Sequence, residues 1–246
     1  MCFSLFCNLL MVHIVGDFYL QSDKTCAEKI NLGFRSKYLY VHGLLIFILS
    51  WVALWSWEFW WLALIVGLTH ILIDGIKSKY GNNLKNFIID QLAHMSVLAA
   101  VTWVLIRYLG WEQLDIVPIN PIIVLVVLAF IICAKPANIF IKTVLQTYSI
   151  DNQSKEENSQ FKAGSLIGTI ERWLILVFVI LEQYDAVGFL LAAKSIIRFK
   201  DTETIKTEYV LAGTLISVAV AVAVAVACGL VINYFDLIHS VLMVCQ

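Results

Sequence analysis

The sequence predicts an all-α integral membrane protein, a polytopic helical bundle with about eight membrane segments. Three observations predict this fold class. Of the 246 residues, 61% are hydrophobic and only 14% are charged, and just three are proline. Apolar runs recur along the whole chain, and the mean hydropathy is +0.84. This composition is typical of membrane proteins and excludes an ordinary soluble domain.

Charge and cysteine content narrow the function classes. The formal net charge is −1, so the basic residues give no reason to expect a nucleic-acid partner. The six cysteines lack CxxC spacing, which argues against a thiolate zinc site and a disulfide framework. The apolar start MCFSLFCNLL has no basic region or small-residue cleavage site, so we expect it to form the first membrane segment.

Eight apolar segments are long enough to cross a bilayer, or nearly so. They cover about 3–20, 40–56, 59–77, 88–107, 119–141, 166–182, 186–199 and 208–232. The seventh is short, and both a full span and a re-entrant segment remain open for it. In the eighth, the run at 218–227 alternates only between valine and alanine, so its length and apolar setting favour a helix.

Basic residues follow the odd-numbered segments, whereas 108–118 and 183–185 contain no lysine or arginine. By the positive-inside rule, the basic loops are cytoplasmic and both termini are non-cytoplasmic. The basic residues behind this orientation are Lys24, Lys29, Arg35, Lys37, Lys77, Lys79, Lys85, Lys142, Lys155, Lys162, Arg198, Lys200 and Lys206.

One hydrophilic stretch divides the chain into two modules. The sequence SIDNQSKEENSQFK begins at residue 149, and we expect a flexible cytoplasmic loop at 149–163. The predicted modules are a five-helix one at 1–148 and a three-helix one at 164–246. The loop is too short to hold a soluble domain.

Seven ionisable residues lie inside the first four apolar segments, where such groups are costly and indicate function. Six of them form three His–Asp pairs with a spacing of four, which places each pair on one helix face. All seven are within roughly two to three turns of the cytoplasmic boundary. We therefore expect one pocket, formed by His13, Asp17, His42, His70, Asp74, Asp90 and His94.

Imidazole and carboxylate ligands without thiolates are typical of zinc, manganese, iron or nickel sites, and zinc is our first expectation. All seven residues are candidate ligands for one or two divalent ions. A bound ion would polarise an ester or phosphoryl oxygen, which indicates hydrolysis at neutral pH. An unligated Asp17 or Asp90 would serve as the general base. A proton or ion pathway and a structural His–Asp network remain alternatives.

A second polar group is predicted on the cytoplasmic side of the C-terminal module. Glu171 is a candidate catalytic residue, and Arg172 and Lys194 are candidates for binding a phosphate or carboxylate. The alternative is that these three residues have a structural role, in ion pairs and in helix packing. Gln21 and Gln91 border the His/Asp layer and are further candidates for contact with the substrate.

These motifs resemble those of a known family. The N-terminal ones are His13-Ile-Val-Gly-Asp17-Phe-Tyr-Leu-Gln21, His42, His70-x-x-Ile-Asp74-x-x-Lys77 and Asp90-Gln91-x-x-His94. The C-terminal ones are Gly168-x-x-Glu171-Arg172 and Gly188-Phe-x-x-Ala-Ala-Lys194-Ser195-x-x-Arg198-Phe199. Together they resemble the bacterial membrane proteins grouped as domain of unknown function 3307, which implies a bacterial inner membrane location but no established activity. A looser similarity to predicted membrane-bound metal-dependent hydrolases favours a hydrolase.

We therefore expect a metal-dependent hydrolase that acts at the cytoplasmic leaflet on an ester or phosphoester of a lipid or another membrane-associated substrate. Membrane lipids are the expected partners, and a homo-oligomer is compatible with the sequence. A divalent-cation or proton transporter and a non-enzymatic subunit with a structural metal are the alternatives. The stretches 44–55 and 98–104 offer no polar continuation across the membrane, which weighs against transport.

Overall fold

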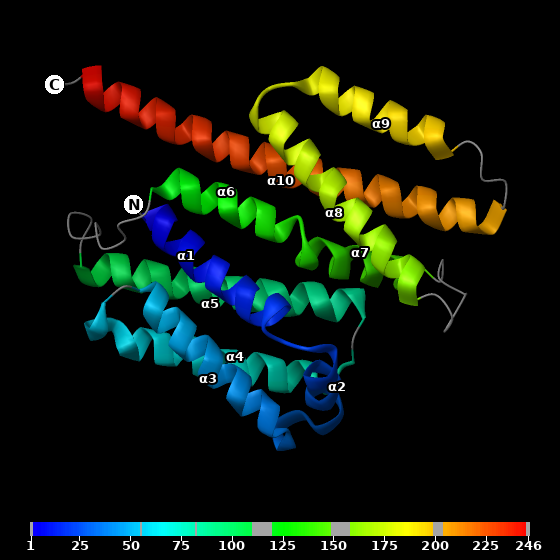
Figure 1. Cartoon of the computed structure of the whole chain (residues 1–246). Helices are drawn as coiled ribbons and strands as arrows, with labels where there is room; N and C mark the ends of the chain where they lie inside the picture. The colour runs from blue at the N-terminus through cyan, green and yellow to red at the C-terminus, as the bar shows by residue number, and fades with distance from the viewer. Residues whose placement is uncertain are drawn as a thin grey trace. The chain divides into compact units, whose positions relative to one another are not determined.

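The structure is a computed structural model that describes residues 2–54, 56–81, 83–109, 120–148, 158–198 and 204–244. These residues form helices joined by short turns, with no strand among them (Figure 1). The all-α class is therefore confirmed. The chain divides into two compact units, Met1–Leu128 and Ala129–Gln246, and each is described by itself below.

Unit 1 contains four long helices and one short helix between the first two of them. They are α1 (Cys2–Ile14), α2 (Asp23–Leu32), α3 (Lys37–Ala53), α4 (Trp60–Lys77) and α5 (Leu84–Leu109). The next helix, α6 (Pro121–Ile132), crosses the boundary between the units.

Unit 2 contains the remaining helices, with α8 packed on α7, α9 and α10. Their bounds are α7 (Lys135–Thr147), α8 (Asn158–Ile180), α9 (Tyr184–Arg198) and α10 (Thr204–Val244). Of the predicted loop at 149–163, residues 149–157 lie outside the described part of the chain, and 158–163 form the first turns of α8. The predicted modules 1–148 and 164–246 stay a prediction.

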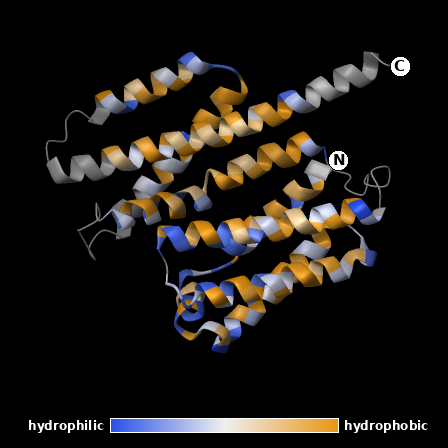
Figure 2. Ribbon diagram, turned by 180° about the vertical axis from the view of Figure 1, so that it is seen from behind, coloured by the Kyte–Doolittle hydropathy of each residue, from blue (hydrophilic) through white to orange (hydrophobic). Residues whose placement is uncertain are grey.

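Four helical segments are long and apolar enough to cross a membrane, within the residues that the structure describes. They are Trp57–Lys77, Leu84–Tyr108, Pro121–Thr147 and Leu211–Tyr234. A fifth results if the bent pair Ser4–Tyr19 and Asp23–Arg35 counts as one span, while Lys37–Ala53 is apolar but shorter. The described parts of all eight predicted segments are mostly helical, and a turn at Cys133 and Ala134 interrupts the fifth. Figure 2 shows apolar residues along these helices and hydrophilic ones around α2.

The chain turns sharply between α1 and α2. The end of α1 widens into a π-helical turn, Val15–Tyr19, in which the Leu20 N–H donates to the Val15 carbonyl at 3.0 Å. The following helix, α2, begins with a capping box: the Ser22 Oγ accepts from the Thr25 N–H, and the Thr25 Oγ1 accepts from the Ser22 N–H. The two helical segments meet at 90°.

The apolar core of unit 1 lies at one end of the α1, α3, α4 and α5 helices. In α1 and α4 the core residues precede His13 and His70, whereas in α3 and α5 they follow His42 and His94. The alternating helix direction therefore separates an apolar end from a polar end. The buried core residues are Leu5, Leu9, Ile46, Leu54, Phe59, Leu62, Ala63, Val66, Leu98, Val101 and Leu105.

Two glycines allow α3 and α4 to approach closely. A Cβ added to Gly67 would lie 2.8 Å from the Phe47 Cβ and 3.0 Å from the Gly43 carbonyl oxygen. A Cβ added to Gly43 would lie 2.1 Å from the Ile71 Cγ1. Small residues at such contacts let helix backbones pack tightly in membranes. The contact lies beside His42 and one turn before His70, so it sets how near these two side chains come.

We expect Gly67→Ala to destabilise the protein by about 1–3 kcal/mol, because the new methyl group meets backbone and Cβ atoms that have little room to move. The measurement is thermal unfolding of the purified protein in detergent. The matched control is Gly188→Ala in α9, where nothing lies within 4 Å of an added Cβ. That change is expected to be neutral or stabilising. Equal melting temperatures for the two variants would contradict the packing argument.

Candidate metal centre

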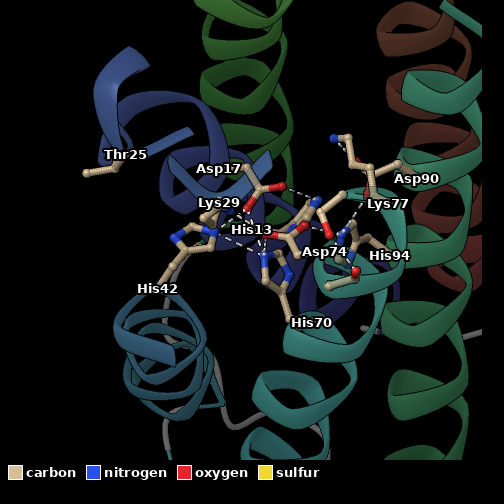
Figure 3. A network of polar contacts seen from close by, with 12 residues as sticks. His13, Asp17, Thr25, Lys29, His42, His70, Asp74, Lys77, Asp90 and His94 are labelled. Atoms are coloured by element: carbon tan, nitrogen blue, oxygen red, sulfur yellow. Dashed lines mark hydrogen bonds and ion pairs between the residues drawn. The ribbon is translucent and has the colours of Figure 1, made fainter. Parts of the chain in front are cut away.

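The structure brings seven side chains together at the polar end of unit 1 (Figure 3). They come from α1, the π turn, α3, α4 and α5, and they point toward one another. The four imidazoles are buried, with exposed fractions between 2% and 7%. We call these residues the His/Asp cluster: His13, Asp17, His42, His70, Asp74, Asp90 and His94.

Asp17 joins three imidazoles at the π turn. Its Oδ1 lies 3.0 Å from the His42 Nε2 and 3.1 Å from the His70 Nε2, and its Oδ2 lies 3.7 Å from the His13 Nε2. Gly16 lets this turn approach α3, since an added Cβ would lie 2.3 Å from the Ile46 Cδ1. Single π turns inside α-helices occur frequently at functional sites. The turn thus positions a carboxylate where α1 meets α3 and α4.

The imidazoles also contact one another. The Nε2 atoms of His42 and His70 are 3.0 Å apart, a distance at which only one of the two nitrogens can carry the proton between them. The rings of His70 and His94 stack with centroids 4.1 Å apart, and the His13 ring lies 4.8 Å from that of His94. The cluster is therefore a continuous group of ring nitrogens.

Asp74 and Asp90 form the other side of the cluster, around His94. The His94 Nε2 lies 3.5 Å from the Asp74 Oδ1 and 3.6 Å from the Asp90 Oδ1. Asp74 also lies near His70, one of the imidazoles that contact Asp17: its Oδ2 is 3.7 Å from the His70 Nε2. The two carboxylates thus turn their Oδ1 atoms toward the same ring nitrogen.

Two lysines bind the outer oxygens of these carboxylates. Lys29, which is buried on α2, donates to the Asp74 Oδ2, and Lys77 donates to the Asp90 Oδ2 at 2.6 Å. Gln91 donates to the same Asp90 oxygen at 3.1 Å. Neither lysine was among the predicted site residues. The signal for Lys77 is its spacing of three from Asp74 on α4, whereas Lys29 and Asp74 are 45 residues apart and no local spacing relates them.

The donor atoms fit a divalent ion. Tetrahedral ligands at about 2.0–2.2 Å from a zinc ion lie roughly 3.3 Å from one another, and the cluster's contacts of 3.0–3.7 Å bracket this spacing. The His13 Nε2, the His94 Nε2 and the Asp90 Oδ1 are buried and have no hydrogen-bond partner among the described residues. Buried polar atoms without partners are rare, and an unseen ligand is one standard explanation.

The C-terminal candidates make contacts within unit 2. Lys194 donates to the Glu171 Oε2, so these two side chains form an ion pair between α8 and α9. Arg172 is 1% exposed, and its guanidinium donates to four acceptors in α7, α8, α10 and the α6–α7 break. These are the Cys133 carbonyl at 2.6 Å, the Asn138 Oδ1 at 2.6 Å, the Ser217 Oγ at 2.9 Å and the Thr169 Oγ1 at 3.1 Å.

The two candidate glutamines differ in their surroundings. Gln91 follows Asp90 on α5 and is engaged with its carboxylate. The Gln21 Nε2, just after the π turn, is buried and has no hydrogen-bond partner in the described part of the chain. The Gln21 amide therefore keeps a donor without a partner among the described residues, whereas the Gln91 amide donates to the Asp90 carboxylate.

Comparison with protein families identifies the part of the chain that carries the cluster. Residues 5–120 match the model of a family described as "Protein of unknown function (DUF3307)". This segment belongs to that family. The DUF3307 segment contains the whole His/Asp cluster together with Lys29 and Lys77. It ends before the C-terminal motifs, so their likeness to longer family members stays a prediction.

No curated protein and no solved structure gives a match to the chain. The looser similarity to predicted membrane-bound metal-dependent hydrolases therefore has no support from these comparisons.

We expect Lys29→Met to lower the free energy of unfolding of the metal-free protein by about 3 kcal/mol, because Asp74 would keep a buried charge without its cation. Adding Asp74→Asn should restore most of the loss. The measurement is chemical unfolding in detergent with chelator present. Lys24→Met, on an exposed side chain of the same helix, is the control and should change stability by less than about 0.5 kcal/mol. A double variant as unstable as the sum of its single changes would contradict this pairing.

Proposed function

We propose that this chain is a membrane-embedded, metal-dependent hydrolase acting on an ester or phosphoester of a lipid or another membrane-associated substrate. One observation carries the proposal: imidazole nitrogens and carboxylate oxygens from α1, the π turn, α3, α4 and α5 converge with spacings suited to a divalent ion. A buried network that served only structure would satisfy its own donors and acceptors, but the Nε2 atoms of His13 and His94 have no hydrogen-bond partner among the described residues.

The proposed roles follow from position in the cluster. His13, His70 and His94 are the central ligands, because their nitrogens lie within 4.8 Å of one another. Zinc suits this donor set best, with manganese, iron or nickel as further candidates. A bound ion supplies Lewis acidity toward a phosphoryl or carbonyl oxygen and lowers the pKa of water. A carboxylate oxygen of Asp17 or Asp90 that does not bind a metal would accept the proton from the attacking water.

Substrate contacts are assigned to residues of unit 1. The Gln21 Nε2 is a free buried donor beside the π turn, suited to an ester or phosphate oxygen. The ion pair of Glu171 with Lys194 and the four hydrogen bonds of Arg172 support structural roles for these three residues. Arg172 in particular cross-links α8 with α7 and α10. The proposed chemistry therefore needs none of them.

We further propose that eight segments lie in a bacterial cytoplasmic membrane, with both termini outside and the His/Asp cluster near the inner leaflet. Support comes from the basic residues after the odd-numbered segments, of which Lys24, Lys37 and Lys79 lie near the polar end of unit 1. Lys29 and Lys77 give weaker support to this orientation under the positive-inside rule, because they pair with buried carboxylates.

The first test measures metal content and hydrolysis together. Protein purified without chelator should carry a divalent metal by elemental analysis and hydrolyse a member of a panel of phospholipids and nitrophenyl esters in mixed micelles. His70→Ala combined with His94→Ala should lose the metal and reduce turnover by roughly 100-fold or more, since several kcal/mol of transition-state stabilisation disappear. Ser96→Ala is the control, because its hydroxyl bonds only to its own helix at the Leu92 carbonyl.

The outcomes separate the candidate functions. Metal content equal in the wild type and the double histidine variant would overturn metal binding by the cluster. Metal without turnover on any member of the panel, together with a melting temperature that falls on chelation, would replace the hydrolase by a non-enzymatic subunit with a structural metal.

Transport of divalent cations or protons is the rival that uses the same side chains. The apolar core opposes it, because Leu5, Leu9, Val66 and Leu98 are buried beyond the cluster. The buried polar side chains in that part of the bundle, Ser4, Asn8, Ser50 and Thr102, carry no charge. We expect proteoliposomes to show no saturable uptake of Zn²⁺ or Mn²⁺ above empty vesicles. Saturable uptake that Asp74→Asn abolishes and Ser96→Ala preserves would favour a transporter over the hydrolase.

A further inference from the structure

The His/Asp cluster contains three groups of three possible ligands, and two of these groups have no shared member, while the third, His13, His70 and His94, shares a histidine with each of them. The first group is Asp17, His42 and His70, and the second group is Asp74, Asp90 and His94. In each group, one donor atom per residue lies within 4.8 Å of the other two. A ring nitrogen binds one ion at a time, so two groups without a shared residue provide two independent sets of ligands.

The first group forms a compact triangle of donor atoms. Its three edges are 3.0 Å between the Asp17 Oδ1 and the His42 Nε2, 3.1 Å between that oxygen and the His70 Nε2, and 3.0 Å between the two nitrogens. Hydrogen bonding alone satisfies this triangle poorly. If both imidazoles donate to the carboxylate, their N–H groups face each other, and if one donates to the other, a nitrogen loses the carboxylate. A cation at the triangle would use all three lone pairs.

The second group has a different arrangement that leads to the same conclusion. Lys29 and Lys77 bind the Oδ2 atoms of Asp74 and Asp90, while both Oδ1 atoms face the His94 Nε2. The lysines therefore leave the inner oxygens free. The Asp90 Oδ1 and the His94 Nε2 are buried and lack hydrogen-bond partners in the described part of the chain. These unpartnered atoms point to a ligand between them.

His13 lies between the groups and can serve either. Its ring centroid is 5.5 Å from that of His70 in the first group and 4.8 Å from that of His94 in the second. Its Nε2 is one of the buried atoms without a hydrogen-bond partner among the described residues. A shared residue of this kind places the two groups side by side, which is the arrangement of two-ion sites that bind a phosphoryl group from both sides.

We propose that the cluster holds two divalent ions, one in each group, and that Lys29 and Lys77 are positioning residues that orient the carboxylates of the second ion. This inference rests on the metal binding of the proposed function and deepens it. Charge favours it as well, because the three carboxylates outnumber the two lysines that pair with them. Two divalent ions would make the site positive and select an anionic substrate such as a phosphoester.

The stoichiometry of the full-length protein in detergent tests the inference. After equilibrium dialysis against Zn²⁺ and, separately, Mn²⁺, we expect two ions per chain in the wild type and in the Ser96→Ala control. His42→Ala removes a ligand of the first group only, and Asp90→Asn removes one of the second group only. Each should retain one ion, and the double variant should retain none. Melting and size-exclusion profiles of each variant verify folding.

The possible results distinguish the inference from the proposed function. One ion in the wild type, lost in both single variants, would overturn the two-ion site and leave metal binding intact. No ion in the wild type would overturn both. A wild type with two ions that both disappear in each single variant would contradict the independence of the two groups.

A milder variant tests the second group where Asp90→Asn fails to fold. Lys77→Met keeps every ligand but removes the cation that holds the Asp90 Oδ2. Loss of such an outer partner weakens metal affinity by roughly 10–100-fold, and we expect this loss for one of the two ions only. In the Mn²⁺ form, the spin-coupled resonance of an ion pair should give way to that of a single ion at limiting metal. Unchanged affinity for both ions would exclude the positioning role of Lys77.

Discussion

The burial of three carboxylates inside apolar helices is the constraint on which the rest of unit 1 depends. An ionised carboxylate in such surroundings is very unfavourable unless it is paired and hydrogen-bonded. Asp74 and Asp90 each receive a lysine on one oxygen, and the Asp17 Oδ1 lies within hydrogen-bond distance of two imidazoles. The position of α2, the π turn and the close approach of α3 to α4 can all be understood as ways to bring these partners within reach.

Each of these features solves a geometric problem that a plain bundle would leave open. A lysine on α2 can reach Asp74 only if the chain reverses after α1, which the 90° bend and the Ser22 capping box accomplish. The imidazoles of His42 and His70 can share Asp17 only if their helices nearly touch, which Gly43 and Gly67 permit. Local irregularities at the polar end therefore serve one cluster.

The sequence predicted contacts between residues that are close in the chain, but not contacts between residues that are far apart in it. Pairs such as His70 and Asp74 are visible because helical spacing is local, and the alternating direction of the segments was enough to expect a common layer. The contact of Lys29 with Asp74 was not visible, because it depends on where the chain reverses. For Arg172 the sequence left substrate binding and packing open, and three of its four hydrogen-bond acceptors lie 34 to 45 residues away in the sequence.

Lys29 and Lys77 also help to distinguish a catalytic from a structural role for a bound metal. In a site where the metal is the only counter-ion, its removal leaves the carboxylates unpaired, and the fold depends on the metal. Here Asp74 and Asp90 keep a lysine each, and Asp17 keeps its imidazoles, so the carboxylates have partners without any ion. Two of the three carboxylates therefore keep a cation without any metal. A metal that the protein can lose without unfolding is better suited to bind and activate a substrate than to hold the helices together, and this favours the hydrolase over the structural subunit.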